Sequence, residues 1–435
     1  MRRLGIPDIR GQRSFVAAVA VDAVGTGLFI PVSLLYFIAT TDLSVEQVGL
    51  TSSIGALIAL PAVLGVGHLV DRVGAKPVLL AANVLMAAGF VGFLFATSFW
   101  SVTVLMAVVG VGGAAFWASE APLVASISQR GERELWFGFL GALRNIGFAL
   151  GGLVGGLAVT IGTTWAYHAI VVANTASFIG CLLLLLRVPA PTPEKHSDDA
   201  APSWSIALRD AEYRWLIASN VVYALSSLTL NVALPIYAKE VLHLPGWVVG
   251  AIFTVNTVLV GFGQGLVVRW MTGRIRYRLA VLSNLAFALG YVLFAGLDVL
   301  SIGMASVVII AVTAVYTIGE LVGGPVLTTI AVDSRPDTVR GRYVAAYQLS
   351  WMAAGIVAPA AYTWLLSRSS TTLWVALIGM SVIGAAINIG MRSRLPLAAA
   401  NVTNAAVSEP AEIGCDENTT ISGVFTPVRR EDTSI

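Results

Sequence analysis

Twelve apolar segments of about twenty residues each follow one another along the chain, and they constrain its fold more than any other feature. A helix rises about 1.5 Å per residue, so about 20 apolar residues cross the roughly 30 Å hydrocarbon core of a bilayer. Of the 435 residues, 57% are hydrophobic and 11% are charged, whereas soluble globular chains carry about 25% charged residues. The composition excludes a water-soluble enzyme and predicts an all-α polytopic membrane protein. The predicted spans are residues 14–39, 47–70, 77–97, 100–127, 136–160, 163–186, 214–239, 247–268, 279–298, 301–331, 342–366 and 371–391.

The basic residues predict the orientation of these spans, because Lys and Arg concentrate in cytoplasmic loops. All but three of the 26 Lys and Arg residues lie on one side of this topology, the exceptions being Arg144, Lys239 and Arg368. We therefore expect a multi-pass protein of the cell membrane with both termini in the cytoplasm. The first apolar run continues past Pro31 to Ala39, which is longer than the apolar region of a signal peptide, so we expect it to stay uncleaved.

One long polar stretch divides the chain into two halves of six spans. This stretch is typical of a linker, and the polar composition of the C-terminal tail predicts disorder. The expected organisation is a cytoplasmic N-terminus at 1–13, a six-helix bundle at 14–186, a cytoplasmic linker at 187–213, a second six-helix bundle at 214–391 and a disordered cytoplasmic tail at 392–435.

The two halves resemble each other at a shift of about 200 residues. Each pair of matching residues is weak alone, since apolar sequences align easily by chance, but all the pairs occur in the same order. The matched pairs are Tyr36 with Tyr237, Gly49 with Gly250, Glu120 with Glu320 and Pro122 with Pro325. This order predicts a two-fold pseudo-repeat, which is common among transporters.

The residues from Gly67 to Lys76, GHLVDRVGAK, form the loop between the second and third predicted spans. This loop resembles the G-x-L-A-D-R-x-G-R-K signature of the major facilitator superfamily, with Gly74 also in register. The resemblance implies two pseudo-symmetric six-helix bundles that work by alternating access. It assigns to Asp71 and Arg72 a charge relay that helps latch the outward-facing state. The alternative is a solvated basic turn that serves only topology.

The fifth span is rich in glycine, which allows a neighbouring helix to approach closely. The spacing is similar to the G-x3-G-P-x2-G-G signature of proton-linked drug exporters of the same superfamily, although Gly152 stands where that signature has proline. The fourth-span arginine of that group is missing between Met106 and Gly113. Helix packing alone explains the glycines equally well. They are Gly147, Gly151, Gly152, Gly155 and Gly156.

Four charged residues fall inside predicted spans, at similar depth: Asp22, Glu120, Arg144 and Glu320. A charge at the bilayer centre costs about 2.5–3.5 kcal/mol, so each residue needs a partner or a wet cavity. The resemblance places the three acids on helices that line a central cavity. Arg144 could pair with Asp22 or Glu120 for purely structural reasons. With three acids and one base, at least one acid must be protonated or must face a cation, which is the chemistry of a proton-coupled transporter.

Aromatic and amide side chains near this layer could hold a large amphipathic substrate by stacking and a few hydrogen bonds. We expect about half of the aromatic ones to face the cavity. The candidates are Trp117, Asn145, Tyr223, Asn231, Tyr347, Gln348 and Trp351. Three further amides, Asn174, Asn256 and Asn284, are expected to form hydrogen bonds between helices.

These observations favour a secondary active transporter that exports a hydrophobic or cationic compound, such as an antibiotic, in exchange for protons. The alternative is an importer or uniporter of a small nutrient. The four histidines are spread along the chain and no nucleotide-binding Gly-Lys-Ser/Thr loop occurs, so we expect neither an enzyme nor an ATP-driven pump. The expected partners are a small-molecule substrate, protons and the lipid bilayer, without nucleic acid, metal or cofactor, and the expected state is a monomer.

Overall fold

The computed structural model describes residues 9, 11–127, 133–189, 210–334, 337–393 and 400–402. These residues contain twelve helical spans long and apolar enough to cross a membrane, which confirms the predicted fold class. The first bundle consists of α1 (Arg13–Phe29) continued by α2 (Ser33–Thr40), α3 (Val45–Val73), α4 (Ala75–Phe93), α5 (Phe99–Ile127), α6 (Arg133–Ile161) and α7 (Thr164–Leu186). The second consists of α9 (Ala211–Leu228) continued by α10 (Ala233–Ile236), α11 (Trp247–Met271), α12 (Arg276–Ala295), α13 (Ile302–Asp333), α14 (Asp337–Arg368) and α15 (Ser370–Gly390).

Local sequence signals account for where several helices begin and end. Ser44 and Gln47 form a reciprocal capping box at the start of α3, which satisfies backbone N–H groups that have no partner within the helix. The Ser369 side chain accepts a hydrogen bond from Thr372 at the start of α15. Helix α3 ends at Val73 and is followed by Gly74, whose φ of 93° is a conformation that glycine adopts without strain.

The first and seventh spans are broken helices, which the predicted continuous spans 14–39 and 214–239 did not anticipate. A short 3₁₀ turn at Ile30–Val32 separates α1 from α2, because Pro31 has no N–H and cannot continue an α-helical ladder. Residues 229–232 form a turn between α9 and α10, and a π-helical turn at Tyr237–Val241 follows. Irregular backbone at membrane depth is found where it lies in the protein interior or beside a cavity.

Equivalent tyrosines in the two bundles make the same long-range hydrogen bond. The Tyr36 hydroxyl donates to the carbonyl oxygen of Phe93 at 3.0 Å, and the Tyr237 hydroxyl donates to that of Phe294 at 2.9 Å. Both bonds close a sequence separation of 57 residues. This repeated contact agrees with the two-fold pseudo-symmetry that the sequence predicts.

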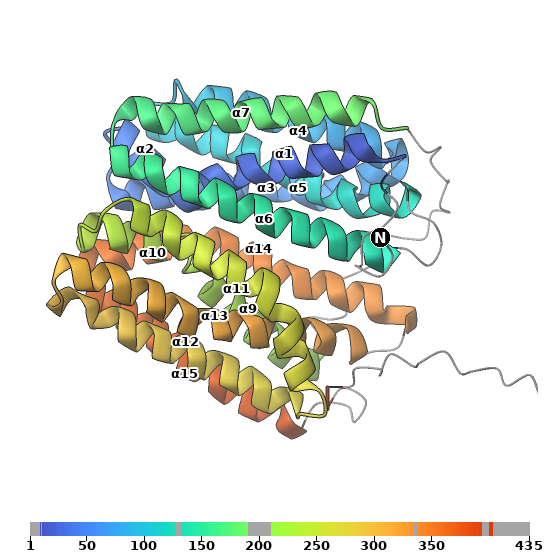
Figure 1. Ribbon diagram of the computed structural model, residues 1–435. Coiled ribbons are helices and arrows are strands. Elements are labelled where there is room, and N and C mark those ends of the chain that lie inside the picture. The colour runs from blue at the N-terminus through green and yellow to red at the C-terminus, as the bar shows by residue number, and fades with distance from the viewer. Residues whose placement is uncertain are drawn as a thin grey trace, which may run out of the picture.

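The two bundles lie one above the other in Figure 1, in contact at the end farthest from the linker and diverging toward the end where α7 stops and α9 starts. Helix α6 packs against α11, and α3 packs against α14. The α6–α11 contact is tight, since a Cβ at Gly156 would lie 2.7 Å from the Cα atom of Gly250. Toward the linker end, a Cβ at Gly67 or Gly265 would meet nothing within 4 Å. The two bundles are therefore in close contact at the far end, whereas these two glycines nearer the linker end have free space beside them.

Part of the predicted disordered tail is ordered. Met391–Ser393 form a 3₁₀ turn after α15, and Asn401 forms an antiparallel bridge with Ile275. Three backbone hydrogen bonds of 2.9 Å join residues 400–402 to Gly273 and Arg274, in the loop before α12, and to Arg276, its first residue. The remaining tail residues, 394–399 and 403–435, and linker residues 190–209 lie outside the described residues.

Candidate functional site

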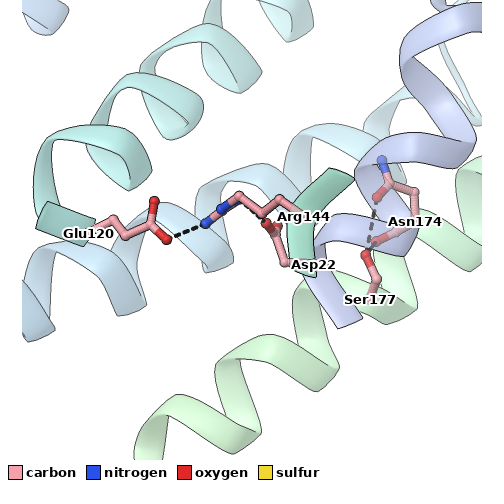
Figure 2. A network of polar contacts seen from close by, with 5 residues as sticks. All are labelled: Asp22, Glu120, Arg144, Asn174 and Ser177. Carbon is pink, nitrogen blue, oxygen red and sulfur yellow. Dashed lines mark hydrogen bonds and ion pairs between the residues drawn. The ribbon is translucent and has the colours of Figure 1, made fainter. Parts of the chain in front are cut away.

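Arg144 on α6 joins two acids from two other helices in the first bundle. Its Nη1 atom lies 3.2 Å from Oδ2 of Asp22 on α1, and its Nη2 atom lies 2.5 Å from Oε1 of Glu120 on α5. Figure 2 shows the guanidinium between the two carboxylates. The exposed fractions of the three side chains are 9% for Arg144, 4% for Asp22 and 12% for Glu120. We call these three residues the Arg144 cluster.

Aromatic rings complete the surroundings of the guanidinium. The Cζ atom of Arg144 lies 4.6 Å from the ring centroid of Trp117 and 5.3 Å from that of Phe116. A cation over an aromatic face is attracted by the negative charge density of the ring. The positive charge of Arg144 is therefore held in place by two carboxylates and two rings.

A cavity with a volume of about 490 Å³ lies beside the Arg144 cluster, lined mainly by the first bundle and also by Asn231, Val232 and Pro359 of the second. We call it the N-bundle cavity. Asp22 and Arg144 lie in its wall, together with Asn174, which accepts a hydrogen bond from Ser177. The remaining wall is mainly aromatic or apolar and includes Phe29, Met86, Phe90, Phe93, Phe116, Trp117 and Phe178.

A second cavity of about 610 Å³ lies between the bundles and reaches into the second one. We call it the central cavity. Its wall includes Asn145 on α6, Asn256 on α11, Glu320 on α13 and Trp351 on α14. Asn231, in the turn that breaks the seventh span, lines both cavities. The two compartments therefore meet at the broken helix.

Glu320 does not join the Arg144 cluster. Its Oε2 atom accepts a hydrogen bond from the Asn256 side-chain amide, which also donates to the Thr317 hydroxyl at 3.0 Å. Within the described chain, no Lys or Arg forms an ion pair with Glu320. The sequence placed all four charged residues in one layer, but the structure joins three and holds the fourth with neutral groups. Asn256 bonds between helices as expected, and its place beside Glu320 had no sequence signal of its own.

The predicted cavity residues divide into two groups. Trp117 lines the N-bundle cavity, Asn145, Tyr223 and Trp351 line the central cavity, and Asn231 lines both. Tyr347 and Gln348 line neither of these two cavities. Tyr347 is buried in helix packing, with its hydroxyl 3.2 Å from that of Thr328, and the Gln348 side chain is exposed.

The predicted latch loop makes one long-range contact among the described side chains. The Lys76 ammonium donates to the carbonyl oxygens of Leu186, at 3.3 Å, and Val188. This cation lies at the C-terminal end of α7, where carbonyl groups lack helical partners. The Arg72 side chain is exposed, and the Asp71 side chain lies outside the described residues.

The glycines of the fifth span face two different helices. Gly147, Gly151 and Gly155 lie against the backbone of α1, where a Cβ would come within 2.5 Å of neighbouring atoms. Gly152 lies against Phe253 and Gly156 against Gly250, both on α11. One helix face thus packs within the bundle and the other forms the contact between bundles.

Within the described ranges, no group of three or more His, Cys, Asp or Glu side chains could hold a metal ion. The two cavities and the buried charged residues are therefore the candidate functional features.

A sequence profile of the Major Facilitator Superfamily matches residues 15–359 and 216–410. The chain belongs to this superfamily. It is therefore a multi-pass membrane transporter that carries a small molecule by secondary transport, and not an enzyme. The match confirms the family that the loop from Gly67 to Lys76 indicated.

Relatives of this transporter differ in what their names say they carry. The chain is 27% identical over 296 residues to the class C tetracycline resistance protein of Escherichia coli, covering 64% of this chain and 72% of the relative. It is 23% identical over 347 residues to a Na⁺, Li⁺, K⁺/H⁺ antiporter of Planococcus maritimus, covering 72% and 79%. A crystal structure of a mutant of the nucleoside transporter NupG superposes with a TM-score of 0.72 at 14% identity, covering 87% of this chain and 99% of that one. At that identity the likeness shows the fold alone.

Proposed function

We propose that this transporter exports a hydrophobic or cationic drug-like compound in exchange for protons. The Arg144 cluster carries the proposal, because one guanidinium faces two carboxylates in the membrane interior. Two relatives support it by name, one a tetracycline resistance protein and the other a cation/H⁺ antiporter.

The charge balance of the cluster suggests how exchange would work. Arg144 balances one unit of negative charge, so the second carboxylate needs a proton or a cation in a medium where charges are poorly solvated. Glu120 has the largest exposed fraction of the three side chains, and we assign it the exchangeable proton. A substrate that disturbs the contact between Arg144 and Glu120 changes the proton affinity of that carboxylate, which couples substrate binding to proton release.

Alternating access follows from the way the bundles meet. We propose that the bundles are open to each other at the linker end and assign this end to the cytoplasm, because the basic residues predict that the termini and the linker lie there. Substrate then enters from the cytoplasm while the α6–α11 and α3–α14 contacts seal the far end. Export requires these contacts to open and the linker end to close, and we assign Asp71 and Arg72 to the latch that holds this second state.

The test is substrate-dependent proton movement in proteoliposomes that contain a pH-sensitive dye. The compounds would be tetracycline, tetraphenylphosphonium, uridine and xylose, with protein-free liposomes as the control. Proton flux opposite to the flux of tetracycline or tetraphenylphosphonium supports the proposal. Flux of protons with uridine or xylose in the same direction would establish a nutrient symporter instead. Substrate flux without any proton movement would leave a uniporter.

A further inference from the structure

Positive charge gathers at the linker end of the second bundle, where α11 is followed by α12 and where α15 ends. From Gly265 to Arg278 the chain has four arginines and no acidic residue. Helix α12 packs against α15, and Figure 1 shows the start of α12 and the end of α15 at the same end of the molecule. Two aromatic residues and three exposed arginines make up what we call the basic patch: Trp270, Arg274, Tyr277, Arg278 and Arg392.

The aromatic residues of the basic patch hold its arginines in place. The Cζ atom of Arg274 lies 4.1 Å from the ring centroid of Trp270, and its Nε atom donates to the Trp270 carbonyl oxygen at 2.9 Å. The Nε atom of Arg278 donates to the Tyr277 hydroxyl at 3.2 Å, and the charge of Arg392 also acts on this hydroxyl. Guanidinium groups from α12 and from the turn after α15 therefore lie near the same phenol.

A segment of the C-terminal tail fixes the backbone of the patch. The N–H groups of Gly273 and Arg276 donate to the carbonyl oxygens of Val402 and Ala400, and the N–H group of Val402 donates to that of Arg274. This pairing has the form of a short antiparallel ladder. It leaves the loop before α12 little freedom, so the patch is ordered before any ligand arrives.

The first bundle treats its equivalent cation differently. By the shift that relates Tyr36 to Tyr237, Lys76 matches Tyr277. The Lys76 ammonium donates to carbonyl oxygens at the end of α7, so the protein itself takes up this charge. In the described part of the second bundle, no carboxylate forms an ion pair with an arginine of the basic patch. The patch therefore presents its positive charge to the surroundings.

Trp270 indicates what those surroundings are. Its side chain is 46% exposed and lies in the last turn of an apolar span, where tryptophan typically marks the boundary between hydrocarbon and headgroups. The arginines beside it are therefore at the depth of lipid phosphates. Guanidinium matches phosphate oxygens in a bidentate geometry, and basic pockets at this depth bind anionic headgroups.

We propose that the basic patch binds the headgroup of an anionic phospholipid from the leaflet at the linker end. Arg278 and Arg392 donate to the phosphate, Arg274 adds positive charge, and Trp270 contacts the glycerol and the start of the acyl chains. A zwitterionic lipid is a poorer ligand, because its own cation is repelled by the three arginines. This assignment does not depend on which substrate the protein transports.

Two double variants separate the patch from net charge alone. Arg278→Gln/Arg392→Gln removes two charges from exposed positions of the patch. The matched control is Arg13→Gln/Arg187→Gln, which removes two charges at exposed positions of the first bundle, at the start of α1 and directly after α7. Both pairs lie at the linker end of the molecule.

The experiment is native mass spectrometry of the full chain in detergent, titrated with dioleoylphosphatidylglycerol or with dioleoylphosphatidylcholine, which has the same acyl chains. We expect the wild-type protein to bind the first molecule of phosphatidylglycerol at least about tenfold more tightly than phosphatidylcholine. Each arginine near lipid phosphates contributes about fivefold. Arg278→Gln/Arg392→Gln should therefore weaken binding of phosphatidylglycerol by about tenfold or more, while the control stays within about twofold of the wild type.

Equal binding of the two lipids by the wild-type protein would overturn the proposal, and this comparison requires no variant to fold. Unchanged binding of phosphatidylglycerol in folded Arg278→Gln/Arg392→Gln would overturn it too, and so would equal losses in both double variants. Displacement of the lipid by an equal concentration of glycerophosphoglycerol, which lacks acyl chains, would establish a site for a soluble phosphate diester instead. Because no substrate or gradient is present, a failed transport assay refutes only the proposed function, and a failed lipid assay refutes only this inference.

Discussion

Arg144 joins three helices of the first bundle, because its guanidinium lies between two carboxylates and two aromatic rings. Asp22 and Glu120 come from different helices, and both contact Arg144. Removing one partner of a buried pair typically costs about 3–5 kcal/mol, because the remaining charge is left without compensation. The residue therefore contributes to stability, and the proposed function assigns it a role in transport as well.

Arg144→Ala should lower the melting temperature of the purified protein and abolish both uphill transport and downhill exchange. Arg144→Lys should restore most of the stability but little of the transport, because a single ammonium cannot contact both carboxylates in the fork geometry of guanidinium. Thermal unfolding and counterflow measure the two effects, and Arg187→Ala, at an exposed arginine, is the matched control. An Arg144→Ala protein as stable and active as this control would show that the cluster is dispensable.

The sequence predicted the four membrane charges and the two candidate partners of Arg144, but not the partner of Glu320. Position along a span gives depth, which is why Asp22, Glu120 and Arg144 could be assigned to one layer. The rotation of each helix depends on packing with neighbouring helices, and this determines that Glu320 meets Asn256 instead of Arg144. For the same reason Tyr347 could not be excluded from the cavity on sequence alone.

At the scale of helices, the number and approximate bounds of the spans were predictable because a bilayer requires about 20 apolar residues per crossing. The breaks in the first and seventh spans were not predictable, although Pro31 marks the position of the first break. A proline can bend a helix or break it, and the neighbouring helices decide which. The break at 229–232 has consequences for the site, since it brings Asn231 to both cavities.

The contact between α6 and α11 provides a test of alternating access at this scale. A Cβ at Gly250 would lie 2.5 Å from the carbonyl oxygen of Gly152, so Gly250→Leu should force these helices apart and favour opening at the far end. In a protein without Cys181 and Cys415, a cysteine at position 231 should then react several-fold faster with a membrane-impermeant reagent applied from that end.

Gly379→Leu is the control for the Gly250→Leu labelling, because its Cβ meets no neighbour within 4 Å. The two variants should express and insert alike. Equal labelling rates in both would mean that the α6–α11 contact does not control access to the cavities.

At the scale of the whole molecule, two bundles share one architecture but differ in what fills them. The equivalent hydrogen bonds of Tyr36 and Tyr237 show that the backbones of the two bundles are arranged alike at these positions. They differ at individual side chains, since Phe116 lines a cavity whereas the Tyr316 hydroxyl donates to the carbonyl oxygen of Ser226. The repeat was visible in the sequence because a few polar and glycine positions recur, whereas the divergence depends on ring packing that a sequence shift does not reveal.

The proposed orientation predicts that the linker and the last loop lie on opposite sides of the membrane. In a protein without native cysteines, single cysteines at position 198 and at position 369 should be labelled by an impermeant maleimide from opposite faces, with position 198 accessible only from the cytoplasm. The basic residues provide the reason, because Lys and Arg are retained on that side. Labelling of both positions from the same face would refute the twelve-span topology.

The central claim is that an acid of the buried charge layer carries the exchanged proton, with Glu120 as the first choice. The decisive measurement compares proton-driven uphill transport with downhill substrate exchange in proteoliposomes containing Glu120→Gln, Asp22→Asn or Glu320→Gln. An amide keeps a hydrogen-bonding group at the site but cannot release a proton, so Glu120→Gln should abolish uphill transport while exchange continues. If all three variants retain full proton-driven accumulation, the charge layer is structural and the antiport proposal is wrong.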